Sequence, residues 1–179
     1  LYLLRNWAKD KHPDFISTWR YGTCFYGSEI NNFDSYKKNE CLAQSALKEN
    51  VLLIGDSHAA QWYHALFSNF PEIKLLQATA SGCSPLIDAP GAKRCTDLRD
   101  YIFEDFLPNN PVKKVILAAR WTSKEAERHL IPTVNYLDSL GVTVFVLGPV
   151  IEFPNRTIID QLHCFINFCL PTRNFQELS

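Results

Sequence analysis

The chain has 179 residues, 46% of them hydrophobic and 13% aromatic, which is enough for a core of its own and argues against disorder. Its net charge is −1 and its lysines and arginines form no long cluster, which argues against nucleic-acid binding. No run of about 18 apolar residues is present, so no segment is predicted to span a bilayer. The sequence begins at Leu1 and contains no methionine, and we expect it to be part of a longer protein.

The six cysteines fall into three pairs of near neighbours along the sequence. An even count without the Cys-x-x-Cys spacing of a zinc knuckle favours disulfide bonds in an oxidising compartment. The alternative is a cytosolic protein with six buried thiols. If pairing is local, the predicted disulfides are Cys24–Cys41, Cys83–Cys95 and Cys164–Cys169.

Residues 1–40 are expected to form an extension arm that packs on a domain formed by residues 41–179. Apolar residues among charged ones up to Trp19 indicate a short helix and an irregular segment, interrupted at Pro13. Residues 21–41 are rich in Tyr, Gly, Asn and Ser, which is typical of a loop.

The next element is a short apolar run at residues 51–54, which predicts a strand buried on both faces. Gly55 and Asp56 end this run, and apolar residues then recur at helical spacing up to Pro71. Ser57 is therefore predicted at the carboxyl end of a strand, where ligands bind in open α/β sheets. Backbone N–H groups at this turn suit a developing oxyanion, whereas the alternative is that Asp56 or Ser57 merely caps the helix.

Strands and helices alternate along the rest of the chain. The pattern predicts a strand at 74–79, a helix at 97–107 with Thr96 as N-cap, a strand at 112–119, a helix at 124–140 ended by Gly141, and a strand at 142–147. The last strand is almost entirely apolar, which predicts a central position in the sheet. This alternation predicts an α/β fold with a mostly parallel sheet that is covered by helices on both sides.

The sequence Gly55-Asp56-Ser57-His58-Ala59 resembles the first block of the SGNH (GDSL-like) esterases and acyltransferases. The histidine after the serine is most similar to the SGNH domains fused to bacterial membrane acyltransferases of the acyltransferase-3 type. The segments 80–85, 115–121 and 141–149 support the resemblance, which covers about residues 41 to 154. It implies a three-layer α/β/α sandwich of the flavodoxin-like kind.

The resemblance also implies an activity, namely O-acyl transfer through a serine acyl-enzyme. The expected group is acetyl, the expected donor is delivered by a fused membrane acyltransferase domain, and the expected acceptor is a cell-surface polysaccharide such as lipopolysaccharide. The domain is then expected in the periplasm or on the outer face of the cell, tethered to the inner membrane. A carbohydrate or lipid esterase and a non-catalytic carbohydrate-binding domain are the alternatives. No cofactor and no metal ion are expected, because no cluster has metal-ligand spacing.

By the same resemblance Ser57 is the candidate nucleophile, and the backbone N–H groups of Ser57 and Gly82 are the candidate oxyanion donors. A glycine at position 82 is expected equally of a turn that carries a disulfide. Asp56 and His58 are expected to line the pocket beside the nucleophile.

The third block of the family usually reads Gly-x-Asn-Asp, but here the strand ends in Arg120 and Trp121 without an asparagine. Arg120 is a candidate replacement donor and Trp121 a candidate wall of the acyl pocket. The alternative is an arginine stacked on a surface aromatic ring.

The catalytic base has two candidate locations. Asp160 and His163 have the Asp-x-x-His spacing of the family's base and its orienting carboxylate, although they follow the preceding strand much sooner than in the family. We favour the second location, beyond Ser179. Residues 41–179 would then form an SGNH-type domain without its C-terminal part, and residues 158–168 an ordinary helix.

Overall fold

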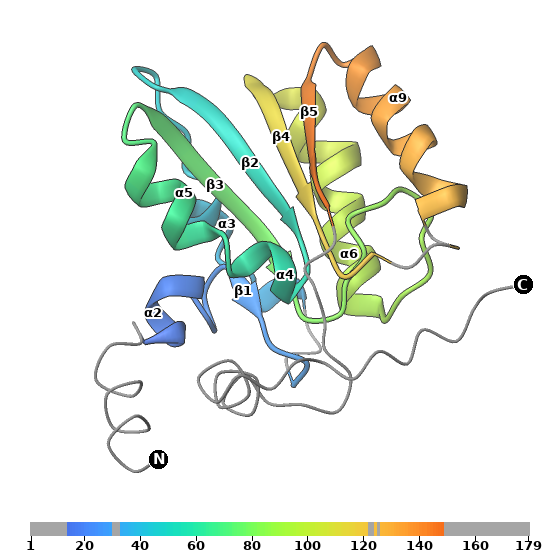
Figure 1. Ribbon diagram of the computed structural model, residues 1–179, viewed down its shortest axis with the longest axis horizontal. Coiled ribbons are helices and arrows are strands. Elements are labelled where there is room, and N and C mark those ends of the chain that lie inside the picture. Colours follow the sequence, from blue (N-terminus) through green and yellow to red (C-terminus); the bar gives the residue numbers. More distant parts are fainter. Residues whose placement is uncertain (1–13, 30–32, 122–123, 125, 149–179) are drawn as a thin grey trace, which may run out of the picture. The chain divides into compact units, whose positions relative to one another are not determined.

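The computed structural model describes residues 14–29, 33–121, 124 and 126–148, which form the fold in Figure 1. Within these ranges no helix is both long and apolar enough to cross a bilayer. The described sheet has five strands in the order β1-β3-β2-β4-β5, and all pairings between them are parallel. The strands are β1 (Phe25–Tyr26), β2 (Glu49–Gly55), β3 (Ile73–Ala80), β4 (Val112–Ala118) and β5 (Thr143–Leu147).

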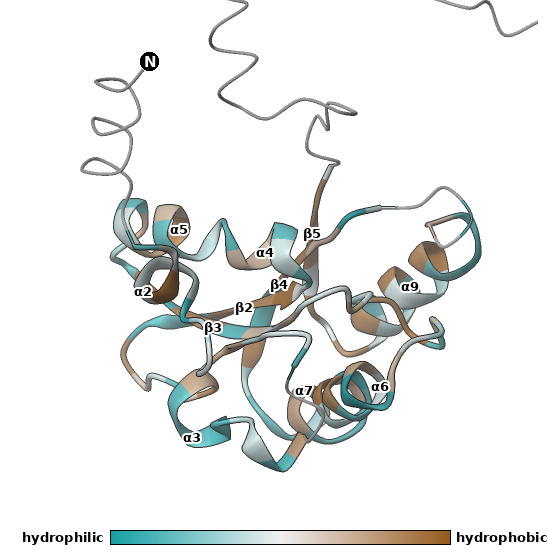
Figure 2. Ribbon diagram, turned by 90° about the horizontal axis from the view of Figure 1, so that it is seen from below, coloured by the Kyte–Doolittle hydropathy of each residue, from teal (hydrophilic) through white to brown (hydrophobic). Residues whose placement is uncertain are grey.

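Helices cover both faces of the sheet, as Figure 2 shows, and the predicted three-layer α/β/α fold is confirmed. One face carries α2 (Phe15–Trp19), α4 (Ser57–Ala60) and α5 (Tyr63–Asn69). The other face carries α3 (Lys38–Cys41), α6 (Lys93–Asp100), α7 (Leu107–Asn109) and α9 (Ile131–Ser139). The remaining short elements are the 3-10 turn η1 (Phe33–Ser35) and the π-helical stretches η2 (Tyr101–Phe106) and η3 (Ala126–Leu130).

The apolar run of β2 contributes to two hydrophobic cores, because successive side chains of a strand point to opposite faces. Leu52 and Ile54 belong to the larger core, which includes side chains of α6 and α9. Val51 and Leu53 belong to the smaller core on the side of α4 and α5. All four are between 0 and 4% exposed, so the predicted strand, buried on both faces, is confirmed.

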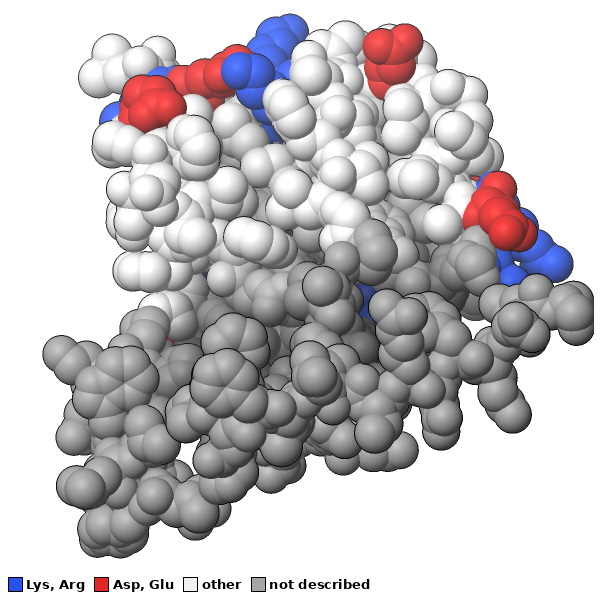
Figure 3. Space-filling view, in the orientation of Figure 1, with Lys and Arg blue, Asp and Glu red and all other residues white. Residues whose placement is uncertain are grey.

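Among the described strands, residues 142–147 do not take the predicted central position. In the described sheet β5 pairs with β4 and lies at the end of the strand order. Two of its apolar side chains are accordingly exposed, Phe145 to 48% and Val146 to 42%. Figure 3 shows that the middle of the described surface in this view carries few charged residues. An apolar run reports only which side chains a strand carries, and it does not determine the strand's place in the sheet.

Two helix boundaries also differ from the predictions. The helix expected from Thr96 begins at Lys93 instead, and the Thr96 hydroxyl donates to the Lys93 carbonyl from inside the first turn at 3.0 Å. The helix expected after Ser57 is divided into α4 and α5. The helix end at Gly141 is confirmed, since Gly141 has a φ of +71° and its N–H donates to the Asp138 carbonyl.

The described part of the N-terminal arm is tied to the sheet. Phe25 and Tyr26 pair with the end of β3, and a disulfide joins Cys24 to Cys41. A second disulfide joins Cys83 to Cys95. Two of the three predicted disulfides are thus confirmed, while Cys164 and Cys169 lie outside the described residues.

Candidate active site

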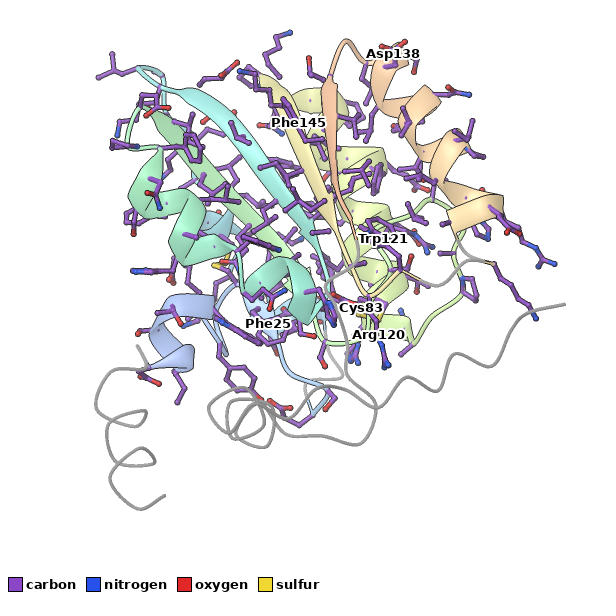
Figure 4. The ribbon with its side chains drawn as sticks, viewed as in Figure 1. Phe25, Cys83, Arg120, Trp121, Asp138 and Phe145 are labelled. Atoms are coloured by element: carbon purple, nitrogen blue, oxygen red, sulfur yellow. A yellow bond between two sulfur atoms is a disulfide. The ribbon has the colours of Figure 1, made fainter. Side chains whose placement is uncertain are left out.

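Strand register brings three loops to one edge of the sheet. Gly55, the last residue of β2, lies opposite Thr79 of β3 and Ala118 of β4. Neighbouring strands are about 4.8 Å apart, so the residues that follow this row leave the sheet close together. Figure 4 shows Cys83, Arg120 and Trp121 at this edge. The candidate residues that follow the three strand ends within a few positions are Ser57, Gly82 and Arg120.

Gly55 allows β2 and β4 to meet closely just before the nucleophile turn. Its φ is +150°, and a Cβ atom built on it would lie 1.7 Å from the Ala118 carbonyl oxygen and 2.9 Å from the Ala59 Cβ. No side chain fits in that space. The backbone of β2 therefore approaches the end of β4 closely, two residues before Ser57.

Asp56 fixes the turn with both oxygens of its carboxylate. One oxygen accepts the His58 N–H at 2.7 Å and caps α4, and the other accepts the Arg120 N–H at 2.9 Å. The side chain is buried, with 6% exposed. Of the two residues considered as caps, Asp56 therefore caps the helix, and the Ser57 hydroxyl is not used for this purpose.

Ser57 is the first residue of α4 and is half-buried. Neither its hydroxyl nor its backbone N–H makes a hydrogen bond to another described residue. Ser57 therefore offers two groups without a described partner. Its hydroxyl can attack the carbonyl carbon of a substrate, and its N–H can donate to the carbonyl oxygen.

Gly82 lies in a tight turn after β3. The Cys83 N–H donates to the Ala80 carbonyl at 3.1 Å, and Gly82 has a φ of +65°. A Cβ atom on Gly82 would meet nothing within 4 Å, and its N–H donates to no described acceptor. The Cys83–Cys95 disulfide connects this turn to α6.

Arg94 holds the same turn from α6, and our reading of the sequence missed it. Its guanidinium donates to the Ser81 carbonyl at 2.8 Å and contacts the sulfurs of Cys83 at 3.1 Å and Cys95 at 3.0 Å. The signal in the sequence was an arginine directly before a cysteine that was predicted to be in a disulfide.

Trp121 joins the ends of β4 and β5. Its indole N–H donates to the carbonyl of Leu147 at 2.6 Å, and its ring packs against the larger core. The Arg120 side chain is exposed, while its backbone N–H is bound by Asp56. These two residues therefore form the third loop at this edge.

A family model described as SGNH domain (fused to AT3 domains) matches residues 23–177. The chain belongs to this family. The resemblance seen in the sequence is thus confirmed. A search of curated proteins found no match.

The periplasmic domain of a lipopolysaccharide acetyltransferase from Salmonella ser. Paratyphi A is similar to this SGNH domain, with a TM-score of 0.68 and 18% sequence identity. The match covers 98% of the present chain and 66% of the other one. The two proteins share a fold, and the present chain spans about two thirds of the length of the solved one.

Asp160 and His163 lie outside the described residues, as does everything after Gly148. His58, next to the candidate nucleophile, is half-buried at the start of α4. Among the described residues no group of three or more His, Cys, Asp and Glu side chains is arranged to hold a metal ion.

Proposed function

We propose that this SGNH domain is an extracytoplasmic O-acyltransferase that carries an acyl group on Ser57 and transfers it to a hydroxyl of a cell-surface polysaccharide. One observation carries the proposal: Ser57 and Gly82 leave adjacent parallel strands at the same edge, each with a backbone N–H that no described acceptor uses. The similar solved domain belongs to a lipopolysaccharide acetyltransferase, which supports acetyl as the group and a surface polysaccharide as the acceptor.

The reaction has two steps. In the first step the Ser57 oxygen attacks the acyl carbonyl and its proton passes to a base; the bond between the acyl carbon and the donor then breaks, and the base gives the proton to the leaving donor. In the second step a sugar hydroxyl gives its proton to the base and attacks the acyl carbon; the bond to Ser57 breaks, and the base gives this proton to the Ser57 oxygen. In both steps the carbonyl oxygen gains negative charge, which the N–H groups of Ser57 and Gly82 stabilise.

The other candidate residues have supporting parts in this proposal. Asp56, His58, Arg120 and Trp121 form the surroundings of Ser57, and the contact between Asp56 and the Arg120 N–H supports this grouping. The base is either His163 with Asp160, or a dyad located later in the protein, which remains the favoured arrangement.

The proposal includes the setting of the domain. Fusion to an AT3 domain, the arrangement in the family description, supports a membrane partner that delivers the acyl donor and tethers the domain outside the inner membrane. The two disulfides support an oxidising compartment. We also propose that residues 1–40 are an extension packed on the domain of residues 41–179, in line with the pairing of β1 with β3.

The test compares Ser57→Ala with Ser139→Ala in the full-length protein that contains this domain. Ser139 is exposed at the end of α9, where the chain approaches the opposite edge of the sheet, and its hydroxyl donates to the Tyr136 carbonyl. NMR of the purified surface polysaccharide should show that the O-acetyl signal is lost with Ser57→Ala and kept with Ser139→Ala. Acetylation at the wild-type level with Ser57→Ala would exclude Ser57 as the acyl carrier.

A further inference from the structure

The turn that holds Gly82 can present its central peptide in two directions. Residues 80–83 form a four-residue turn closed by the Cys83 N–H, with a positive φ at Gly82 and none at Ser81, which defines type II. In a type I turn the peptide between the two central residues is rotated by roughly half a turn. The N–H of Gly82 therefore faces one side of the loop or the other, depending on this single peptide.

Arg94 contacts the carbonyl of that same peptide. Its Nη2 donates to the Ser81 oxygen at 2.8 Å, and no described peptide bond is cis. In a trans peptide the carbonyl and the following N–H point in opposite directions. With the Ser81 oxygen directed at Arg94, the Gly82 N–H is directed away from Arg94, and it donates to no described acceptor.

The guanidinium is itself held in place. Its Nη1 contacts both sulfurs of the Cys83–Cys95 disulfide, at 3.1 and 3.0 Å, and these cysteines directly follow Gly82 and Arg94 in the sequence. The planar fork of arginine suits several fixed contacts at once. Because a cation is bound to the Ser81 carbonyl, the peptide is also polarised, which strengthens its N–H as a donor.

We propose that Arg94 is a positioning residue for the oxyanion site: it keeps the Ser81–Gly82 peptide in the orientation that presents the Gly82 N–H to the substrate's carbonyl oxygen. This inference rests on the proposed function for its catalytic consequence. The orientation of the peptide, however, can be measured without any activity.

The activity test uses Arg94→Met and Arg94→Lys, with Arg99→Met as the matched control. Arg99 lies on the same helix and binds Asp100 and the Ala89 carbonyl, and none of its hydrogen bonds goes to the Gly82 turn. With an aryl acetate and the full-length protein, Arg94→Met should lower kcat by about 10- to 100-fold with KM little changed, since the lost stabilisation belongs to the transition state. Arg94→Lys, which keeps a cationic donor, should recover part of kcat, and Arg99→Met should match the wild type.

A double variant tests whether Arg94 acts through Gly82. Gly82→Ala disfavours the positive φ and thus the type II orientation, so adding Arg94→Met to it should lower kcat no further. Independent, multiplied losses would overturn the proposal, as would a wild-type kcat in folded Arg94→Met. If Arg94→Met fails to fold, Arg94→Gln takes its place under the same criterion.

The structural test is NMR of the chain labelled with ¹⁵N-glycine. Only seven glycines are present, and Gly82→Ala identifies the signal of Gly82. The signal should move in Arg94→Met and stay unchanged in Arg99→Met. An unchanged Gly82 signal in Arg94→Met overturns the inference even if the protein proves to be an acyltransferase. A wild-type protein without turnover overturns the proposed function, and the NMR result then decides the orientation by itself.

Discussion

The carboxylate of Asp56 accepts the backbone N–H of Arg120 at 2.9 Å, a bond between residues 64 positions apart in the sequence. Its other oxygen accepts the N–H of His58 and caps α4. One buried side chain therefore sets the nucleophile turn after β2 against the loop after β4. The aspartate of the Gly-Asp-Ser block thus has a structural role that does not depend on proton transfer.

Asp56→Ala should lower the free energy of unfolding by about 2–4 kcal/mol, because it removes a helix cap and the carboxylate acceptor of the part-buried Arg120 N–H. Asp56→Asn should lose less, since one amide oxygen still accepts while its NH₂ group faces the second donor. Urea unfolding measures both values. Asp97→Ala is the control, because its ion pair with Lys93 at 2.7 Å is on the surface and should contribute at most about 1 kcal/mol. Equal losses for Asp56→Ala and Asp97→Ala would contradict this account.

Gly55→Ala should prevent stable folding or lower the free energy of unfolding by more than about 3 kcal/mol. The added Cβ would lie 1.7 Å from a backbone oxygen of β4, and a strand backbone in the centre of the sheet cannot move aside as a side chain can. Circular dichroism during thermal unfolding checks this expectation. A folded Gly55→Ala with the wild-type midpoint would show that the close approach of β2 and β4 is absent.

Gly82→Ala and Gly141→Ala form a pair that separates backbone strain from catalysis. Both glycines have positive φ values, +65° and +71°, and neither has an atom within 4 Å of a built Cβ. Each substitution should therefore destabilise the fold by a similar amount, about 1–2 kcal/mol. Only Gly82→Ala should lower kcat, by about 10-fold or more, because only this glycine of the pair follows the strand next to β2, at the edge of the sheet where Ser57 lies. An equal effect of both substitutions on kcat would remove Gly82 from the oxyanion site.

Much of this fold could be predicted from local patterns in the sequence. The apolar run before Gly55 and the helix end at Gly141 depend on neighbours in the chain, and both are as expected. The position of β5 could not be predicted, because strand order depends on contacts between distant segments.

For the candidate site, the sequence indicated which residues to consider but not the hydrogen bonds that hold them in place. Ser57 and Gly82 stand out because each is the second residue after the end of a strand. The role of Asp56 in holding Arg120, and of Arg94 in holding Ser81, depends on hydrogen bonds to backbone atoms of other segments. Such bonds place no constraint on the identity of the residue whose backbone is bound, so the sequence does not show which carbonyl or N–H a side chain reaches. For Arg94 the sequence shows only that it precedes a cysteine predicted to be in a disulfide.

The buried tyrosines of the larger core predict loss of stability in alkali. Tyr36 is 3% exposed and its hydroxyl donates to the Gln77 carbonyl at 2.6 Å. Burial raises the pKa of Tyr36 well above its ordinary value of 10.0, and burial together with the charge of Asp34 raises the pKa of Tyr26 to about 12. The folded protein therefore keeps these protons at a pH at which the unfolded chain releases them.

The sign follows from linkage. Because the folded-state pKa is raised, the stabilisation is fully present below about pH 10 and is lost as pH rises toward the folded-state value. For Tyr36 alone the free energy of unfolding should fall by about 1.4 kcal/mol per pH unit above about pH 10. Urea midpoints measured between about pH 8 and pH 11 check this slope. Tyr36→Phe should be less stable at about pH 8, by roughly 1 kcal/mol for the lost hydrogen bond, and should show a shallower alkaline slope. A slope in Tyr36→Phe as steep as in the wild type would mean that Tyr36 does not cause the alkaline loss.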